Sequence, residues 1–186
     1  MARLKEPDDV QLKTLLQRIE RRDENALTEL HQLFSRRIFA FALHRLSDAH
    51  DAETVVADTL FEVWKNPGRF RGESKVSTWV LGIAHFKILN TVRARGAAHE
   101  CIDDYAEVFE SPEHTPMMHM ELRQQRDAVI GCMEKLTAPH RECMQLVFYE
   151  GLSLAEVAQV QSVPENTVKT RLFHARKNLK TCLQRI

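Results

Sequence analysis

The stretch from Asp8 to Asn66 contains neither glycine nor proline, and this limits the fold more than any other feature of the sequence. Glycine and proline interrupt regular elements, so a long stretch without them favours long helices. Within it Leu27, Leu30, Phe34 and Phe41 recur at intervals of three, four and seven residues, the spacing of one face of an amphipathic helix. Because no segment alternates as a strand does, the sequence predicts an all-α protein.

Further helices are predicted from caps and breakers. Ser47-Asp48 offers an N-cap for a second helix, which Asn66-Pro67-Gly68 ends, and a third helix runs from Val76 to about Arg95. Four short helices follow Leu122. The third of these begins with a Ser153-to-Glu156 capping box, and Pro164 opens the fourth. The fourth has an apolar stripe at helical spacing: Val168, Leu172, Ala175 and Leu179.

Charge is segregated along the chain although 26 basic and 26 acidic residues cancel overall. Residues 65–95 hold seven Lys or Arg against one acid, and residues 97–122 hold seven acids and no Lys or Arg. Two prolines also interrupt that acidic segment. We therefore expect two small helical domains, 1–96 and 122–186, joined by a flexible acidic linker, 97–121. Residues 163–186 form a second basic segment, with six Lys or Arg against one acid. The two basic segments indicate two surfaces that bind polyanions; ordinary solvated helix faces are the alternative.

Several classes of protein are excluded or disfavoured. No apolar run approaches the roughly 20 residues needed to span a bilayer, and the charged N-terminus does not resemble a secretory signal, so we expect a cytoplasmic protein. The four cysteines are scattered without a CxxC pair, which favours reduced thiols over disulfides. Neither His140 with Cys143 nor His99 with Cys101 completes a metal site. Because no catalytic motif is present, we expect no enzyme, no catalytic residue, no metal and no cofactor.

The strongest local pattern is a helix-turn-helix over Gly151–Arg176. A short capped helix, a turn through Gln161-Ser162-Val163 and a longer basic helix follow one another. Opposite the apolar stripe, one face of the last helix gathers polar and aromatic residues: Asn166, Lys169, Thr170, Phe173 and Lys177. Residues near the helix start are expected to meet base edges, while Arg176, Lys177 and Lys180 reach phosphates. The alternative is a plain helical hairpin.

The first basic segment has aromatic residues between its cations: Trp64, Phe70, Trp79 and Phe86. Aromatic faces stack on unpaired bases while cations follow the backbone, so this composition suits single-stranded nucleic acid. Burial of the two tryptophans in the core is the alternative, because large aromatic side chains are mostly buried.

Taken together, the motifs resemble the extracytoplasmic-function (ECF, group IV) sigma factors of the sigma-70 family. Asp51-Ala52-Glu53 through Asp58 to Phe61-Glu62-Val63-Trp64 resembles the helix of these proteins that binds core RNA polymerase. Phe70-Arg71-Gly72-Glu73-Ser74, then Ser77-Thr78-Trp79 and Ile83-Ala84, resembles the segment after it. The promoter-reading domain is matched by Leu136–Glu142, Glu150–Ser153, Glu156–Ala158 and Thr167–Leu172. Ser162 and Asn166 stand where many members have glycine.

The resemblance implies an alternative sigma factor that binds core polymerase at the clamp of its largest subunit and directs initiation at specific promoters. It also implies control by an anti-sigma protein, and no direct insertion into a membrane. Polymerase contacts are expected at Asp51, Glu53, Asp58, Leu60, Phe61 and Glu62. Contacts with the −10 element are expected at Phe70, Arg71, Ser74, Lys75, Ser77 and Asn90. Contacts with the −35 element are expected at Asn166, Lys169, Thr170, Arg171, Phe173, His174, Arg176 and Lys177. The alternative function is a helix-turn-helix regulator with an N-terminal sensor or dimerisation module.

Overall fold

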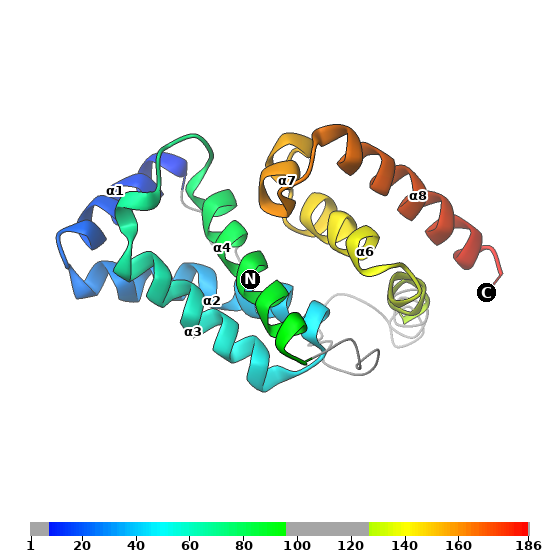
Figure 1. Cartoon of the computed structure of the whole chain (residues 1–186), viewed down its shortest axis with the longest axis horizontal. Coiled ribbons are helices and arrows are strands. Elements are labelled where there is room, and N and C mark those ends of the chain that lie inside the picture. Colours follow the sequence, from blue (N-terminus) through cyan, green and yellow to red (C-terminus); the bar gives the residue numbers. More distant parts are fainter. Residues whose placement is uncertain (1–7, 96–126, 186) are drawn as a thin grey trace, which may run out of the picture. The chain divides into compact units, whose positions relative to one another are not determined.

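The computed structural model describes residues 8–95 and 127–185, and the chain forms two compact units (Figure 1). The expected linker, 97–121, lies outside the described residues. Both units consist of helices, and the described ranges contain no strand. The prediction of an all-α fold is therefore confirmed. No helix in either described range is long and apolar enough to cross a lipid bilayer.

The N-terminal unit has four α-helices and a short 3-10 turn: α1 (Asp9–Glu20), α2 (Glu24–Leu46), α3 (Ala49–Lys65), η1 (Pro67–Arg69) and α4 (Val76–Arg95). Three of the helices were predicted, with Asp48 as the N-cap of α3. Helix α1 was not, although its start carries a capping box in which the Asp8 carboxylate accepts a hydrogen bond from the Gln11 N–H at 2.8 Å. The chain turns at Arg22, in the left-handed region with φ of 64°, before Asp23 caps α2.

The core of this unit includes the predicted stripe of α2, except for Leu27, which is half-buried. Leu30, Phe34, Ile38 and Phe41 of α2 are buried, and they recur every three or four residues along one face. Helix α3 contributes a buried stripe that includes Val56, Leu60 and Val63, and α4 one that includes Val80, Ala84 and Ile88. Helix α3 packs on both α2 and α4, so its two sides face different neighbours. The distinction between those sides matters for the functional site.

The C-terminal unit contains a helix over residues 127–134, then α6 (Ala138–Met144), a π-helical turn η2 (Gln145–Tyr149), α7 (Leu154–Gln161) and α8 (Glu165–Leu183). The predicted capping box of α7 is present: the Ser153 N–H donates to Oε2 of Glu156 at 2.8 Å, and the Glu156 N–H donates to Oγ of Ser153 at 3.3 Å. Ser162 occupies the turn with a φ of 53°, the left-handed conformation that glycine usually supplies. The predicted helix-turn-helix layout is therefore present.

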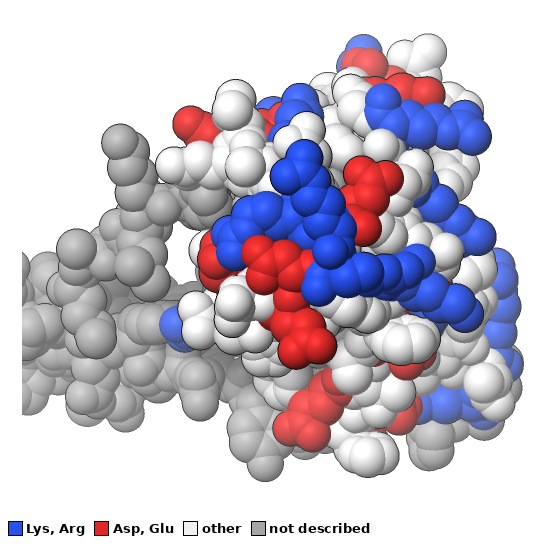
Figure 2. Space-filling model, turned by 90° about the vertical axis from the view of Figure 1, so that its left-hand side faces the viewer, with Lys and Arg blue, Asp and Glu red and all other residues white. Residues whose placement is uncertain are grey.

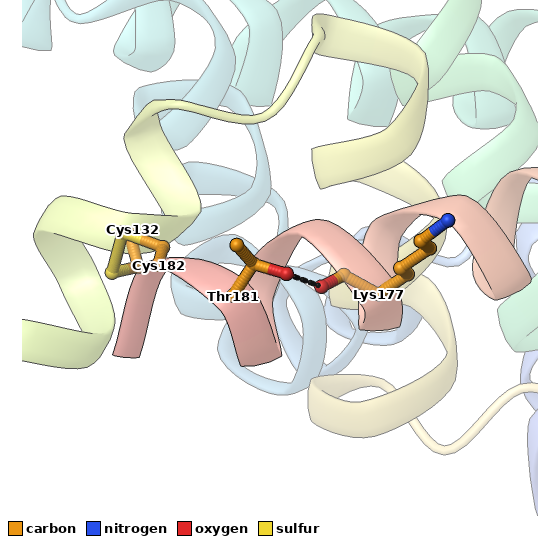
Figure 3. Close-up of a disulfide and its surroundings, with 4 residues drawn as sticks. All are labelled: Cys132, Lys177, Thr181 and Cys182. Atoms are coloured by element: carbon orange, nitrogen blue, oxygen red, sulfur yellow. Dashed lines mark hydrogen bonds between the residues drawn. A yellow bond between two sulfur atoms is a disulfide. The ribbon is translucent and has the colours of Figure 1, made fainter. Parts of the chain in front are cut away.

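The expectation of reduced thiols was wrong for two of the four cysteines. Cys132, on the helix over 127–134, forms a disulfide with Cys182 near the end of α8, across a Cα–Cα distance of 5.8 Å (Figure 3). The two residues are 50 apart in sequence, and they meet because α8 returns to the helix that opens the unit. Spacing along the chain gives no sign of such a pair. Cys143 is buried, and Cys101 lies outside the described residues.

Candidate nucleic-acid and partner interfaces

Helix α8 presents the face predicted from its helical wheel. Val168, Leu172 and Ala175 are buried, while the polar and aromatic residues of the opposite face are exposed: Asn166, Lys169, Thr170, Phe173 and Lys177. The ring of Phe173 is 66% exposed, an unusual state for a phenylalanine. Such a face on the second helix of a helix-turn-helix is suited to the major groove, where it would meet base edges near the helix start.

Several side chains on this face are held by neighbours. Lys169 lies 2.9 Å from the Glu165 carboxylate, and the Thr170 hydroxyl donates to the carbonyl of Asn166 at 2.9 Å. The edge of the Phe173 ring meets His174 at a centroid distance of 5.4 Å. A hydroxyl that has donated its proton still offers lone pairs, so Thr170 would act as an acceptor toward DNA.

A pair of stacked histidines joins α8 to α6, with His174 exposed and His140 half-buried. His174 stacks on His140 of α6 at a centroid distance of 6.2 Å, and Nδ1 of His140 is buried with no hydrogen-bond partner among the described residues. Burial lowers the pKa of His140, and the neighbouring His174 and Arg171 lower it further. Arg171 is half-buried beside this pair and so lies off the exposed face that carries the other expected −35 residues.

The π-helical turn η2, which was not predicted, exposes two aromatic side chains beside α8. The Glu150 N–H donates to the carbonyl of Gln145, five residues earlier, at 3.0 Å, and the rings of Phe148 and Tyr149 are left 59% and 73% exposed. The guanidinium of Arg176 lies 5.1 Å from the centre of the Phe148 ring, within the range of a cation–π contact. The side chain of Arg176, an expected −35 residue, is therefore positioned by this contact with Phe148. No motif in the sequence signals a π turn.

Most of the expected −10 residues lie together after η1. Arg71 and Lys75 are exposed, and Phe70, Ser74 and Ser77 are half-buried. The Phe70 ring packs against Trp79 of α4 at a centroid distance of 5.5 Å, so part of the Phe70 side chain is buried within the N-terminal unit. Gly72 has a φ of 75°, where a side chain would strain the turn. Asn90 is exposed but lies four turns along α4, about 20 Å from Val76.

The expected polymerase-binding residues divide between two sides of α3. Three acids form ion pairs within the unit: Asp51 with Arg95, Asp58 with Lys87 at 3.9 Å, and Glu62 with Arg69 at 2.9 Å. Three of the seven cations in the first basic segment are thus neutralised by α3. Acidic and basic side chains also lie next to one another on the face shown in Figure 2. The basic segment therefore makes a smaller positive surface than its sequence predicts.

The other three expected residues, Glu53, Leu60 and Phe61, line a groove of about 620 Å³ between α2 and α3. Most of its remaining lining is apolar or aromatic, including Leu27, Phe39, Val56 and Trp64, with His31 and Arg36 among its polar members. The Phe61 ring is 61% exposed at this groove. An exposed aromatic beside an apolar groove is a typical anchor point for a partner helix.

Within residues 8–95 and 127–185, no three side chains among His, Cys, Asp and Glu come close enough to hold a metal ion. His99 and Cys101 lie outside those ranges.

Two family models match the chain, in order. Sigma-70 region 2 matches residues 30–98, which include α3 and α4, and Sigma-70 region 4 matches residues 126–179, which include the helix-turn-helix. Together the matches cover about two thirds of the chain.

Relatives and solved structures agree with these matches. The chain is 28% identical over 178 residues to the ECF RNA polymerase sigma factor SigK of Mycolicibacterium vanbaalenii, covering 93% of this chain and 89% of the relative. It is 26% identical over 174 residues to the protein of the same name from Mycobacterium tuberculosis H37Rv, covering 92% and 93%. Its fold is similar to that of the sigma factor RpoE of Bartonella quintana, solved with the anti-sigma factor NepR (TM-score 0.65, 22% identity, 84% and 96% covered). It is also similar to CnrH, solved with the cytosolic domain of CnrY (TM-score 0.64, 20% identity, 92% and 96% covered).

Proposed function

This chain belongs to the sigma-70 family of RNA polymerase sigma factors, and from that premise we propose that it is an alternative sigma factor of the ECF group. It binds core RNA polymerase and directs initiation at a specific set of promoters. The observation that carries the proposal is the order of the two matches: a region 2 model and a region 4 model fall on successive helical parts of one chain. A free-standing regulator with the same helix-turn-helix would have no need of region 2.

Run-off transcription from a fragmented genomic library tests this function. The purified chain is added to core polymerase from the source cell, and transcripts are compared with those from core polymerase alone. We expect a small set of new start sites that share one upstream pattern. A protein that instead binds a near-palindromic site as a dimer, and adds no transcripts, would be a conventional regulator. The proposed protein is an initiation factor without catalytic activity of its own, and it works in the cytoplasm, where the polymerase is.

We assign the three interfaces to three surfaces. The α2–α3 groove, with Phe61 at its edge, would receive the clamp of the largest polymerase subunit, because its apolar lining suits a helix. The segment after η1 and the exposed Asn90 would contact the melted −10 strand. Base stacking would involve Phe70, and the backbone would lie near Arg71 and Lys75. The exposed face of α8 would read the −35 element.

Control by an anti-sigma protein is the second part of the proposal. The structurally similar RpoE was solved in complex with an anti-sigma factor, NepR, and CnrH in complex with the cytosolic domain of CnrY. An inhibitor of this chain would gain most by covering the α2–α3 groove and part of the C-terminal unit together, because linking two weak contacts raises affinity through effective concentration. The test is to recover the chain from its source cell with its bound proteins. A recovered inhibitor must block run-off transcription when purified, and the Phe61→Ala variant must weaken its binding.

A further inference from the structure

The segment between α3 and α4 has little structure of its own to fix it. Residues 66–75 contain the single 3-10 turn η1, a glycine with positive φ at Gly72, and the bends that follow it. This segment nevertheless carries four of the residues to which we assign −10 contacts: Phe70, Arg71, Ser74 and Lys75. A segment that must meet a melted strand in a defined geometry needs supports at both of its ends.

Helix α1 supplies a support at the far end of the segment. Oδ1 of Asp9 accepts a hydrogen bond from the backbone N–H of Val76, the first residue of α4, at 2.8 Å. Oδ2 of the same carboxylate lies 2.8 Å from Nζ of Lys13. The first N–H groups of a helix have no partner within the helix, and a carboxylate there also meets the positive end of the helix dipole. Asp9 therefore acts as the N-cap of α4 from 67 residues away in the sequence.

The near end of the segment is held by the turn after α1. The Arg22 guanidinium donates to the carbonyl of Trp64 at 2.8 Å and lies 5.3 Å from the centre of the Trp64 indole. Helix α1 also contacts η1 directly, and Glu20 at its end lies beside Gly68. Helix α1, about 18 Å long, therefore has a contact beside one end of the segment at its start and beside the other end at its finish.

Charge at Asp9 favours this role near neutral pH. Partial burial acts to raise the pKa of the Asp9 carboxyl, but the hydrogen bonds from Lys13 and from the Val76 N–H, with the charges of Lys13 and Lys75, lower it overall. The group is therefore ionised when the protein works, and both of its oxygens are free to accept hydrogen bonds.

We propose that α1 positions the −10 segment for promoter opening, and that Asp9 is a positioning residue because it fixes the start of α4. This inference rests on the proposed function of the segment and goes beyond it. Helix α1 lies before the residues matched by the region 2 model, which begin at residue 30. Helix α1 would affect the rate of strand separation, because duplex binding and polymerase binding are assigned to other surfaces.

Three variants of the full chain distinguish the hydrogen bond from Val76 to Asp9 from the ion pair between Asp9 and Lys13. Asp9→Ala removes both the cap and the ion pair with Lys13. Asp9→Asn keeps an acceptor oxygen for the Val76 N–H but loses the ion pair, and asparagine is as good an N-cap as aspartate. Lys13→Ala removes the ion pair alone. Each is assembled with core polymerase on a promoter found by the run-off screen, with 2-aminopurine in the −10 element to report strand separation.

We expect Asp9→Ala to open duplex promoter roughly 3- to 30-fold more slowly, the range that corresponds to the loss of one N-cap. Asp9→Asn and Lys13→Ala should open it at nearly the wild-type rate. All four proteins should bind core polymerase with the same affinity, and all should initiate equally well on a template with a pre-melted −10 element.

The inference would be overturned if Asp9→Ala opened the duplex as fast as wild type, if pre-melting left its defect in place, or if Asp9→Asn were as slow as Asp9→Ala. Failure of the wild-type protein to open any promoter with core polymerase would instead contradict the proposed function. The two failures are therefore distinguishable.

Discussion

Single side chains on α8 should differ in what they contribute to promoter choice. Lys169 lies near the start of the helix on its exposed face, and Lys180 lies about three turns further along. We expect Lys169→Ala to reduce discrimination between −35 sequences by roughly 1–3 kcal/mol, because a base contact is lost. Lys180→Ala should weaken binding to all sequences alike and reduce the salt dependence, because a phosphate contact is lost. Affinities for matched and mismatched duplexes at two salt concentrations check this, and equal effects of both variants on promoter choice would contradict it.

His140 should make the stability of the C-terminal unit sensitive to mild acid. Burial, His174 and Arg171 lower the pKa of His140 in the folded state below its usual 6.5. The unfolded chain then binds a proton more readily, so the stability contributed by neutral His140 is complete above pH 6.5 and is lost as the pH falls through the folded pKa. Thermal midpoints of the C-terminal transition between pH 8 and pH 5 measure the loss.

The matched control for this prediction is His140→Phe, which keeps a ring against His174 but cannot titrate. Its midpoint should vary less over the same range. The aspartates of the N-terminal unit with lowered pKa values, Asp9, Asp23 and Asp48, start from a reference of 3.8, so their contribution is lost only in stronger acid. Identical pH profiles for wild type and His140→Phe would show that the stacked histidines do not carry the effect.

At the scale of elements, one side of α3 forms ion pairs with η1 and α4, and the other side lines the groove that we propose as a partner site. Substitutions on the two sides should therefore have different effects. Phe61→Ala removes an exposed ring at the groove, so we expect core polymerase to bind at least 1 kcal/mol more weakly with the thermal midpoint unchanged. Asp51→Ala removes a partner of Arg95, which also contacts Asp48 and the carbonyl of Leu46. It should cost roughly 1 kcal/mol of unfolding free energy. A loss of polymerase binding by a fully stable Asp51→Ala protein would place Asp51 at the interface.

The elements that could be predicted are those whose signal is local. The stripes of α2 and α8 were read correctly because Leu30 and Phe34, or Val168 and Leu172, repeat within a few turns of one helix. Helix α1 was missed although Asp8 and Gln11 form its capping box, since no break separates it from the next helix in the sequence. The two contacts that hold the ends of α4, Asp51 with Arg95 and Asp9 with Val76, join parts of the chain that are distant in sequence. Spacing rules carry no information about such pairs.

On the scale of the whole molecule, the disulfide should make the two units respond differently to a reducing agent. The Cys132–Cys182 bond closes a loop of about 50 residues, and such a link contributes up to about 4 kcal/mol by restricting the unfolded chain. At roughly 4–8 °C per kcal/mol for a domain of this size, reduction should lower the thermal midpoint of the C-terminal unit by up to about 15–30 °C and leave that of the N-terminal unit unchanged. Calorimetry with and without reductant measures this. Cys182→Ser should match the reduced protein and be insensitive to reductant; equal midpoints for oxidised and reduced wild type would contradict the prediction.

The ion pairs of α3 also have a consequence for promoters whose two elements are separated by different lengths of DNA. Asp51 holds the end of α4 through Arg95, Asp58 holds its middle through Lys87, and Glu62 holds the turn before it through Arg69. Helix α4 therefore cannot slide or rotate against α3 without breaking these contacts. If polymerase binds in the groove on the other side of α3, as we propose, it would meet the −10 strand at a distance that these contacts help to keep constant. On this assignment, tolerance of a longer or shorter spacer would have to come from outside the N-terminal unit.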